Sequence, residues 1–87
     1  FRMGLVDVLV EEEDFQKTIV TLANKIAGNA PIASQLTKHL VRTAQSAPLE
    51  VGLAYENDLF AYCFTTDDAS EGNAAFLEKR SPHFSGK

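Results

Sequence analysis

The sequence predicts a mainly α-helical protein, with a short N-terminal strand followed by about four amphipathic helices. Two observations carry this prediction. Apolar residues recur every three or four positions in four successive segments, which is the spacing of one face of a helix. These segments are separated by glycine, proline or threonine at points where helices usually end or begin. The chain has 87 residues, enough for one domain with a modest core.

Residues 4–10, GLVDVLV, form the only run typical of a β-strand, because aliphatic and β-branched side chains follow a glycine. The chain holds no second run of this kind, so a partner strand would have to come from elsewhere. A lone strand leaves its backbone groups unpaired at an edge. Two interpretations remain open: a strand, or an extended lead-in to the first helix.

The first helix is expected over residues 11–28. Its apolar face comprises Phe15, Ile19, Leu22 and Ile26. The four consecutive carboxylates of residues 11–14 could be read as a metal site. At a helix start, however, such carboxylates usually complement the helix dipole and stay solvated, so we expect no metal there. Gly28 provides the stop signal for this helix.

The second and third helices are expected to begin near Pro31 and Pro48, because proline fits the first turn of a helix. The apolar face of the second comprises Ile32, Leu36, Leu40 and Val41. The apolar stripe of the third comprises Leu49, Leu53, Phe60, Cys63 and Phe64. His39 has no acidic or cysteine partner at a spacing that indicates catalysis, so we expect it at the surface.

Glu56 interrupts the apolar stripe of the third helix. A carboxylate on a core face costs several kcal/mol unless it is paired or hydrogen-bonded. Glu56 could lie at the edge of the stripe and reach water. We favour a structural role instead, in which its buried carboxylate has a hydrogen-bond or salt-bridge partner.

The fourth helix is expected to begin at Thr66, a natural N-cap, with Asp67 and Asp68 in its first turn. Gly72 lies in the helix interior, where glycine costs roughly 1 kcal/mol relative to alanine. We therefore expect Gly72 to mark close packing against another backbone. Pro82 ends the helix. Thr66 and Gly72 are thus structural candidates.

Composition excludes several functional classes. The net charge of −4 argues against a basic nucleic-acid interface, and the apolar runs are too short for membrane insertion. The single cysteine allows no internal disulfide, and no Cys/His cluster has zinc spacing. A free thiol without a signal peptide indicates the cytoplasm, or the mitochondrial matrix in a eukaryote. No nucleotide-binding loop or catalytic motif is present, so no cofactor and no catalytic residue are predicted.

Three stretches, taken in order, resemble the C-terminal third of the crotonase superfamily, which contains the enoyl-CoA hydratases and isomerases. They are GLVDVLV, ANKIAGNAPIASQLTK and LEVGLAYENDLFAYCFTTDDASEGNAAFLEKRSPHF. Each stretch alone is a weak match to this superfamily. The three together, in the same order and over nearly the whole chain, are a specific match. Residues 1–87 are thus expected to be a C-terminal helical cap and trimerisation region, without the N-terminal ββα spiral domain. A chain that opens Phe1-Arg2-Met3 fits a fragment of a longer protein.

The resemblance implies a parent enzyme that acts on acyl-CoA and assembles as a homotrimer or hexamer. Its oxyanion hole and catalytic carboxylates would precede residue 1, so this chain alone is expected to be inactive. The resemblance places Phe60, Phe76 and Lys79 at the CoA pocket of a neighbouring subunit. Hydratase and isomerase chemistry both stay open, and the isolated chain is expected to self-associate. The alternative is a free-standing helical interaction module without catalysis.

Overall fold

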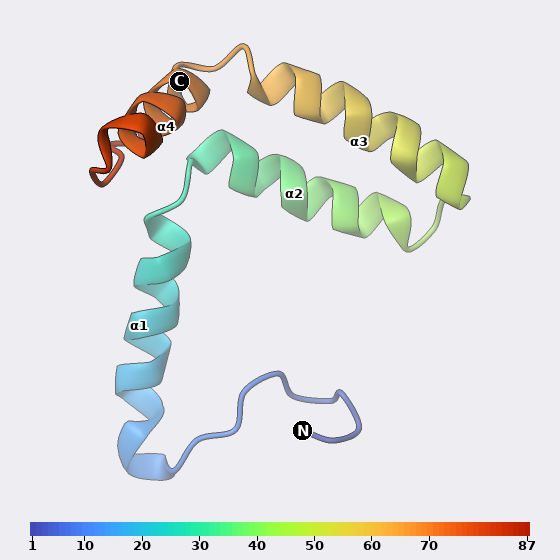
Figure 1. The fold of residues 1–87 in the computed structure, drawn as a ribbon. Coiled ribbons are helices and arrows are strands. Elements are labelled where there is room, and N and C mark those ends of the chain that lie inside the picture. The colour runs from blue at the N-terminus through green and yellow to red at the C-terminus, as the bar shows by residue number, and fades with distance from the viewer.

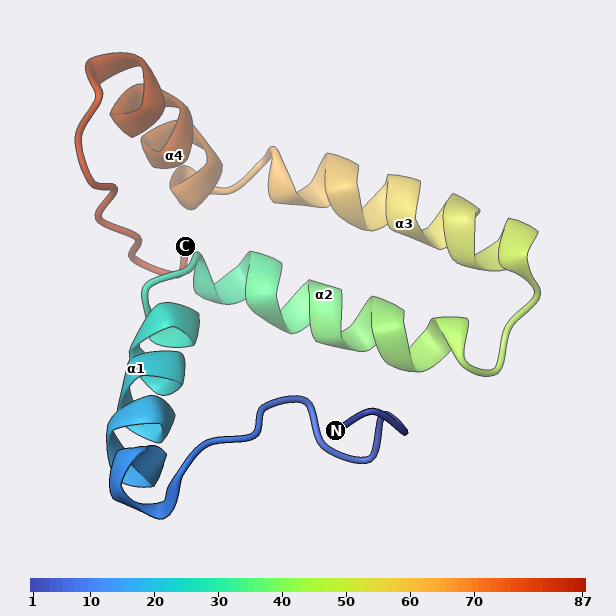
Figure 2. The ribbon, with the colours of Figure 1, turned by 60° about the horizontal axis from the view of Figure 1, so that its bottom comes forward.

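Four α-helices follow one another in this computed structural model, which describes residues 1–87 (Figure 1). They are α1 (Phe15–Ala27), α2 (Pro31–Ala44), α3 (Leu49–Cys63) and α4 (Asp67–Glu78), with a short 3-10 helix η1 (Glu12–Asp14) before α1. The mainly helical class is therefore confirmed. Helix α1 points away from the antiparallel pair α2 and α3, and α4 follows at the far end of α3 (Figures 1 and 2).

The N-terminal strand predicted for residues 4–10 is wrong, because these residues form an irregular lead-in to η1, with bends at residues 4, 5 and 7, and not a strand. The chain starts with a turn in which the N–H of Gly4 donates to the carbonyl of Phe1 at 2.9 Å. Gly4 has a φ of +72°, a conformation that glycine adopts without strain. A strand is stabilised by backbone hydrogen bonds to a neighbour, and these 87 residues provide no second strand.

Proline, threonine and glycine stand at the helix boundaries, as the sequence predicts. Pro31 is the first residue of α2, and Pro48 is the N-cap residue of α3. Thr66 is the N-cap of α4, where its Oγ1 accepts a hydrogen bond from the N–H of Ala69 at 3.1 Å. Gly28 ends α1 at a φ of −78°, so this cap does not use the left-handed conformation open to glycine.

The helices have little interior of their own. The main packing joins α2 to α3, where the rings of His39 and Tyr55 meet edge to face with centroids 5.7 Å apart. Only Asp68 and Ala75 are buried, so no hydrophobic core forms within the chain. None of the helices combines the length and apolar character that would let it cross a lipid bilayer.

The dimensions of the molecule agree with an open arrangement. The radius of gyration is 16.4 Å, whereas a compact domain of this length has about 12 Å. The accessible surface is 7565 Å², against roughly 5000 Å² for a compact protein of this mass. The apolar faces of the helices are therefore largely uncovered in this chain.

Candidate functional site

Residues 81–87 run back along α4 and return to its N-terminus (Figure 2). The N–H groups of Asp67 and Asp68 donate to the carbonyl of Lys87 at 2.8 and 3.3 Å. N–H groups at a helix start have no acceptor within the helix, so the end of the chain supplies one. Helix α4 and the tail thus form one unit, the α4–tail unit, which comprises residues 66–87.

The side chain of Asp68 anchors the tail. Asp68 is 3% exposed, and one carboxylate oxygen accepts from the N–H of Ser85 at 2.6 Å and from its hydroxyl at 3.4 Å. The other oxygen accepts from the N–H of Gly86 at 2.9 Å. Gly86 has a φ of +73°, and a Cβ there would lie 3.4 Å from Pro31, so the tail also reaches the start of α2. The buried carboxylate is therefore satisfied by the segment that it holds.

Gly72 lies against an aromatic ring of the tail. A Cβ at this position would be 3.5 Å from the ring of Phe84. The sequence correctly marks Gly72 as a point of close approach, but the neighbour is a side chain and not another backbone. The physical reason is the reversal of the chain after α4, which lays the tail along the helix.

Glu71, in the middle of α4, and Arg80, just beyond the C-terminal end of α4, form a bidentate ion pair. The Nη1 and Nη2 atoms of Arg80 donate to the two carboxylate oxygens of Glu71 at 2.6 and 2.9 Å. The N–H of His83 donates to the same carboxylate at 2.7 Å, and Nε of Arg80 donates to Glu78 at 2.6 Å. Arg80 is thereby held by two carboxylates, and Glu71 accepts from three donor groups that belong to two residues.

These hydrogen bonds perturb both charged groups. The guanidinium of Arg80, with the His83 N–H and the neighbouring positive charge, lowers the pKa of Glu71 from 4.5 to about 2. Hydrogen bonds to Glu71 and Glu78 raise the pKa of Arg80 above its ordinary value. A general base works best with a pKa near the operating pH, so an ionised, fully engaged Glu71 is suited to structure and not to proton transfer.

Lys79 occupies the left-handed turn that ends α4. Its φ and ψ are 55° and 40°, and it is the one non-glycine residue with positive φ. The N–H of Lys79 donates to Phe76 at 3.3 Å and that of Arg80 to Ala75 at 3.0 Å, the pattern of a Schellman cap. Glycine is the usual residue here, because a left-handed conformation costs other residues roughly 1–2 kcal/mol. The ammonium group is exposed and makes no hydrogen bond or ion pair.

The two aromatic candidates are both exposed, Phe76 by 83% and Phe60 by 63%. Phe60 packs edge to face on Phe64 of its own helix, with centroids 5.0 Å apart. A hairpin of α3 and α4 would have brought Phe60 to Phe76 and Lys79. The hairpin in this chain is instead α2 and α3, so the structure does not gather the three residues through helix packing (Figures 1 and 2).

Glu56 lies at an open groove of about 500 Å³ between the end of α2 and the start of α3. Its apolar walls include Leu40, Val41 and Leu53. Glu56 is exposed and makes no hydrogen bond or ion pair, so the expected buried partner is not supplied by these 87 residues.

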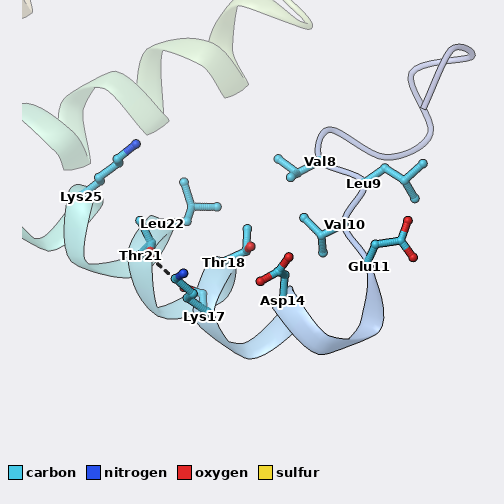
Figure 3. Close-up of a pocket in the computed structure, with 10 residues that line it drawn as sticks. All are labelled: Val8, Leu9, Val10, Glu11, Asp14, Lys17, Thr18, Thr21, Leu22 and Lys25. Carbon is cyan, nitrogen blue, oxygen red and sulfur yellow. Dashed lines mark hydrogen bonds between the residues drawn. The ribbon is translucent and has the colours of Figure 1, made fainter.

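A second open groove, of about 570 Å³, separates residues 8–11 from α1 (Figure 3). Val8, Val10 and Leu22 contribute apolar surface, and Lys17 and Lys25 contribute charge. The residues around it are exposed or half-exposed. No group of three His, Cys, Asp or Glu side chains gathers where it could hold a metal ion.

From the sequence alone, Asp68 is expected only to complement the helix dipole, and Glu71 has no predicted role. Both anchor the tail through contacts across 9 to 18 residues of sequence. A signal was present: Asp68 and Glu71 are three apart and share a helix face, and Arg80 follows the same helix. What the sequence did not show was the direction in which the chain reverses after α4.

Comparison with known proteins identifies the family. The profile described as Enoyl-CoA hydratase/isomerase matches residues 1–87. The short-chain-enoyl-CoA hydratase of Clostridium acetobutylicum is 38% identical over 79 residues, which cover 91% of this chain and 30% of that protein. The 2,3-dehydroadipyl-CoA hydratase of Escherichia coli is 38% identical over 84 residues, or 97% of this chain and 33% of that protein.

A solved structure shows the same arrangement of helices. The crystal structure of an enoyl-CoA hydratase from Bacillus anthracis superposes with a TM-score of 0.94 at 34% identity, over 99% of this chain and 33% of that one. The chain spans about a third of the length of the curated relatives that it matches. The family profile covers every residue, and the fold is shared with a solved structure at 34% identity. The chain therefore belongs to the enoyl-CoA hydratase/isomerase family, which is the crotonase superfamily.

Proposed function

We propose that residues 1–87 form the C-terminal helical cap and trimerisation region of an enoyl-CoA hydratase or isomerase, with a ββα spiral domain upstream. The observation that carries this proposal is the apolar surface that α1, α3 and α4 leave uncovered. On α1, for example, Phe15, Leu22 and Ile26 are 51%, 50% and 58% exposed. Exposed apolar surface of this extent is typical of an interface, and a spiral domain and neighbouring subunits would cover it.

The proposed substrate is an acyl-CoA thioester. The relatives named above are a short-chain-enoyl-CoA hydratase and a 2,3-dehydroadipyl-CoA hydratase, which favours hydration of a carbon–carbon double bond next to a thioester carbonyl. Such a reaction requires donors that stabilise negative charge on the carbonyl oxygen, and an acid–base pair. We place these groups upstream of residue 1. The role of this chain is to cover the active site, support assembly and contribute to CoA binding.

The proposed CoA contacts are Phe60, Phe76 and Lys79. Exposed aromatic rings can pack on the adenine or the pantetheine arm, and an ammonium group can pair with a phosphate. The left-handed conformation of Lys79 supports a functional role, because the lysine occupies a position where glycine would be less strained. An exposed ammonium–phosphate contact is worth about 1 kcal/mol, and more where water is excluded.

The test is Lys79→Ala in the full-length enzyme. We expect KM for crotonyl-CoA to rise several-fold while kcat changes little, because CoA is bound about equally in ground and transition states. Lys38→Ala, which removes an exposed lysine from α2, is the matched control and is expected to leave both constants unchanged. A fall in kcat with unchanged KM, or no kinetic effect, would contradict a CoA-binding role.

The proposed partners are further subunits of the same enzyme, in a homotrimer or hexamer. In that assembly the groove beside Glu56 would be covered, and its carboxylate would gain the partner that this chain lacks. The proposed compartment is the cytoplasm, or the mitochondrial matrix in a eukaryote. A relative from Dictyostelium discoideum, 31% identical, is named a probable mitochondrial enoyl-CoA hydratase.

A further inference from the structure

The turn at Lys79 is held by the residue that follows it. Arg80 donates its backbone N–H to Ala75 within the Schellman cap, while its guanidinium reaches back to both oxygens of Glu71. Arg80 is therefore fixed at its backbone and at its side chain. Because the two residues are adjacent, a fixed Arg80 restricts the dihedral angles that Lys79 can adopt.

Glu71 also holds the chain beyond Arg80. The same carboxylate accepts the N–H of His83, so it fixes the chain on both sides of Pro82. A single side chain in the middle of α4 thus determines how the backbone leaves the helix. Without it, the two cap hydrogen bonds and the contact of Arg80 with Glu78 would be left to hold the left-handed conformation of Lys79.

The two basic residues of this turn differ in whether their charge is paired. The guanidinium of Arg80 is paired with Glu71 and also with Glu78. The ammonium group of Lys79 has no partner within the chain and is exposed. Glu71 therefore leaves Lys79 as the unpaired cation of the turn, in a fixed backbone conformation.

Building on the CoA-binding role of Lys79 proposed above, we propose that Glu71 is a positioning residue for Lys79. It acts through Arg80 and the His83 N–H to hold the left-handed turn from which the lysine presents its ammonium group to a phosphate of CoA. Glu71 itself contacts neither the ligand nor the reacting atoms.

The test is Glu71→Gln in the full-length enzyme, assayed with crotonyl-CoA. This change keeps the size of the side chain and removes the charge that holds Arg80. We expect KM to rise several-fold and kcat to stay within about twofold. The matched control is Glu50→Gln, an exposed and unpaired glutamate in the first turn of α3, which is expected to change neither constant.

A double variant separates positioning from a general loss of structure. If Glu71 acts through Lys79, Glu71→Gln will raise KM in the wild-type background but not further in the Lys79→Ala background. An equal rise in both backgrounds would overturn the proposal, and so would an unchanged KM. A lower KM would overturn it as well, because it would mean that the released Arg80 binds the phosphate better than the positioned lysine does.

Amide hydrogen exchange tests the local mechanism independently of CoA. Glu71→Gln is expected to speed exchange at Lys79, Arg80 and His83, and unchanged exchange there would refute the positioning role. If Lys79→Ala leaves KM unchanged while exchange responds as expected, the CoA role of Lys79 fails and the inference fails with it. If Lys79→Ala raises KM but Glu71→Gln does not, the positioning role alone fails.

Discussion

Among single residues, Glu71 has the most strongly lowered pKa, and this gives the chain a defined response to acid. Its pKa is about 2 in the folded chain, against 4.5 for an unperturbed glutamate. The contribution of Glu71 to stability is therefore complete above the unfolded-state pKa. It is lost as the pH falls from about 4.5 towards 2, because the unfolded chain then binds the proton more readily.

We predict that an NMR titration of the Glu71 carboxyl group has its midpoint near pH 2, and that the His83 amide signal follows it. In Arg80→Ala, which removes the largest cause of the shift, the midpoint should move up towards the ordinary value. A wild-type midpoint near 4.5 would show that the ion pair does not persist in solution.

The roles of some single residues can be predicted from the sequence, and those of others cannot. Thr66 was predictable as an N-cap because its acceptor role involves only Ala69, three positions on. The roles of Asp68 and Glu71 were not, because their partners lie in a tail whose path is set by the turn at Lys79. A lysine gives no sequence signal that it adopts a conformation typical of glycine.

At the scale of elements, the α4–tail unit depends on the buried carboxylate of Asp68. Asp68→Asn replaces one acceptor oxygen by an NH₂ group that faces the N–H donors of Ser85 or Gly86. We predict that the tail detaches, at a cost of about 1–3 kcal/mol, because one of the two N–H donors loses its acceptor and the buried side chain of residue 68 is no longer fully satisfied. Hydrogen exchange at the Ser85 and Gly86 amides measures this directly and is expected to accelerate.

Asp67→Asn is the control for this prediction. It removes the same charge from the same helix turn, but Asp67 is exposed and its side chain makes no hydrogen bond. Only the small dipole contribution should be lost, with little change at Ser85 and Gly86. Equal acceleration in both variants would mean that helix-dipole charge, and not the buried anchor, holds the tail.

The positions of the helices could be predicted because they depend on local sequence. The strand prediction failed because a strand depends on a segment elsewhere in the chain. The four helices follow from apolar spacing and from the residues at their ends, such as Pro31 and Pro48. Residues 4–10 have strand-like composition but no strand, because a ladder requires a second segment. Which helices pack together could not be predicted for a related reason: the apolar face of a helix is recognisable in the sequence, but the neighbour that covers it is not.

The whole molecule exposes 7565 Å², which is roughly 2500 Å² more than a compact protein of its mass. Much of the excess is apolar, as the exposed Ile19, Val20 and Phe64 illustrate. We predict that the isolated chain self-associates, because apolar surface of this extent gains free energy when it is covered. Light scattering at tens of micromolar is the measurement. A strictly monomeric chain that binds no hydrophobic dye would contradict the prediction.

The proposed function makes these residues the assembling and CoA-binding part of an acyl-CoA enzyme whose chemistry lies upstream. Hydration of crotonyl-CoA, measured in parallel for the 87-residue chain and for the full-length protein that contains it, tests this claim most directly. We predict turnover by the full-length protein and none above background by the chain, because the oxyanion donors and the acid–base pair are proposed to lie upstream of residue 1. Turnover by the purified chain alone would contradict the account, and so would a full-length protein that neither hydrates nor isomerises any enoyl-CoA.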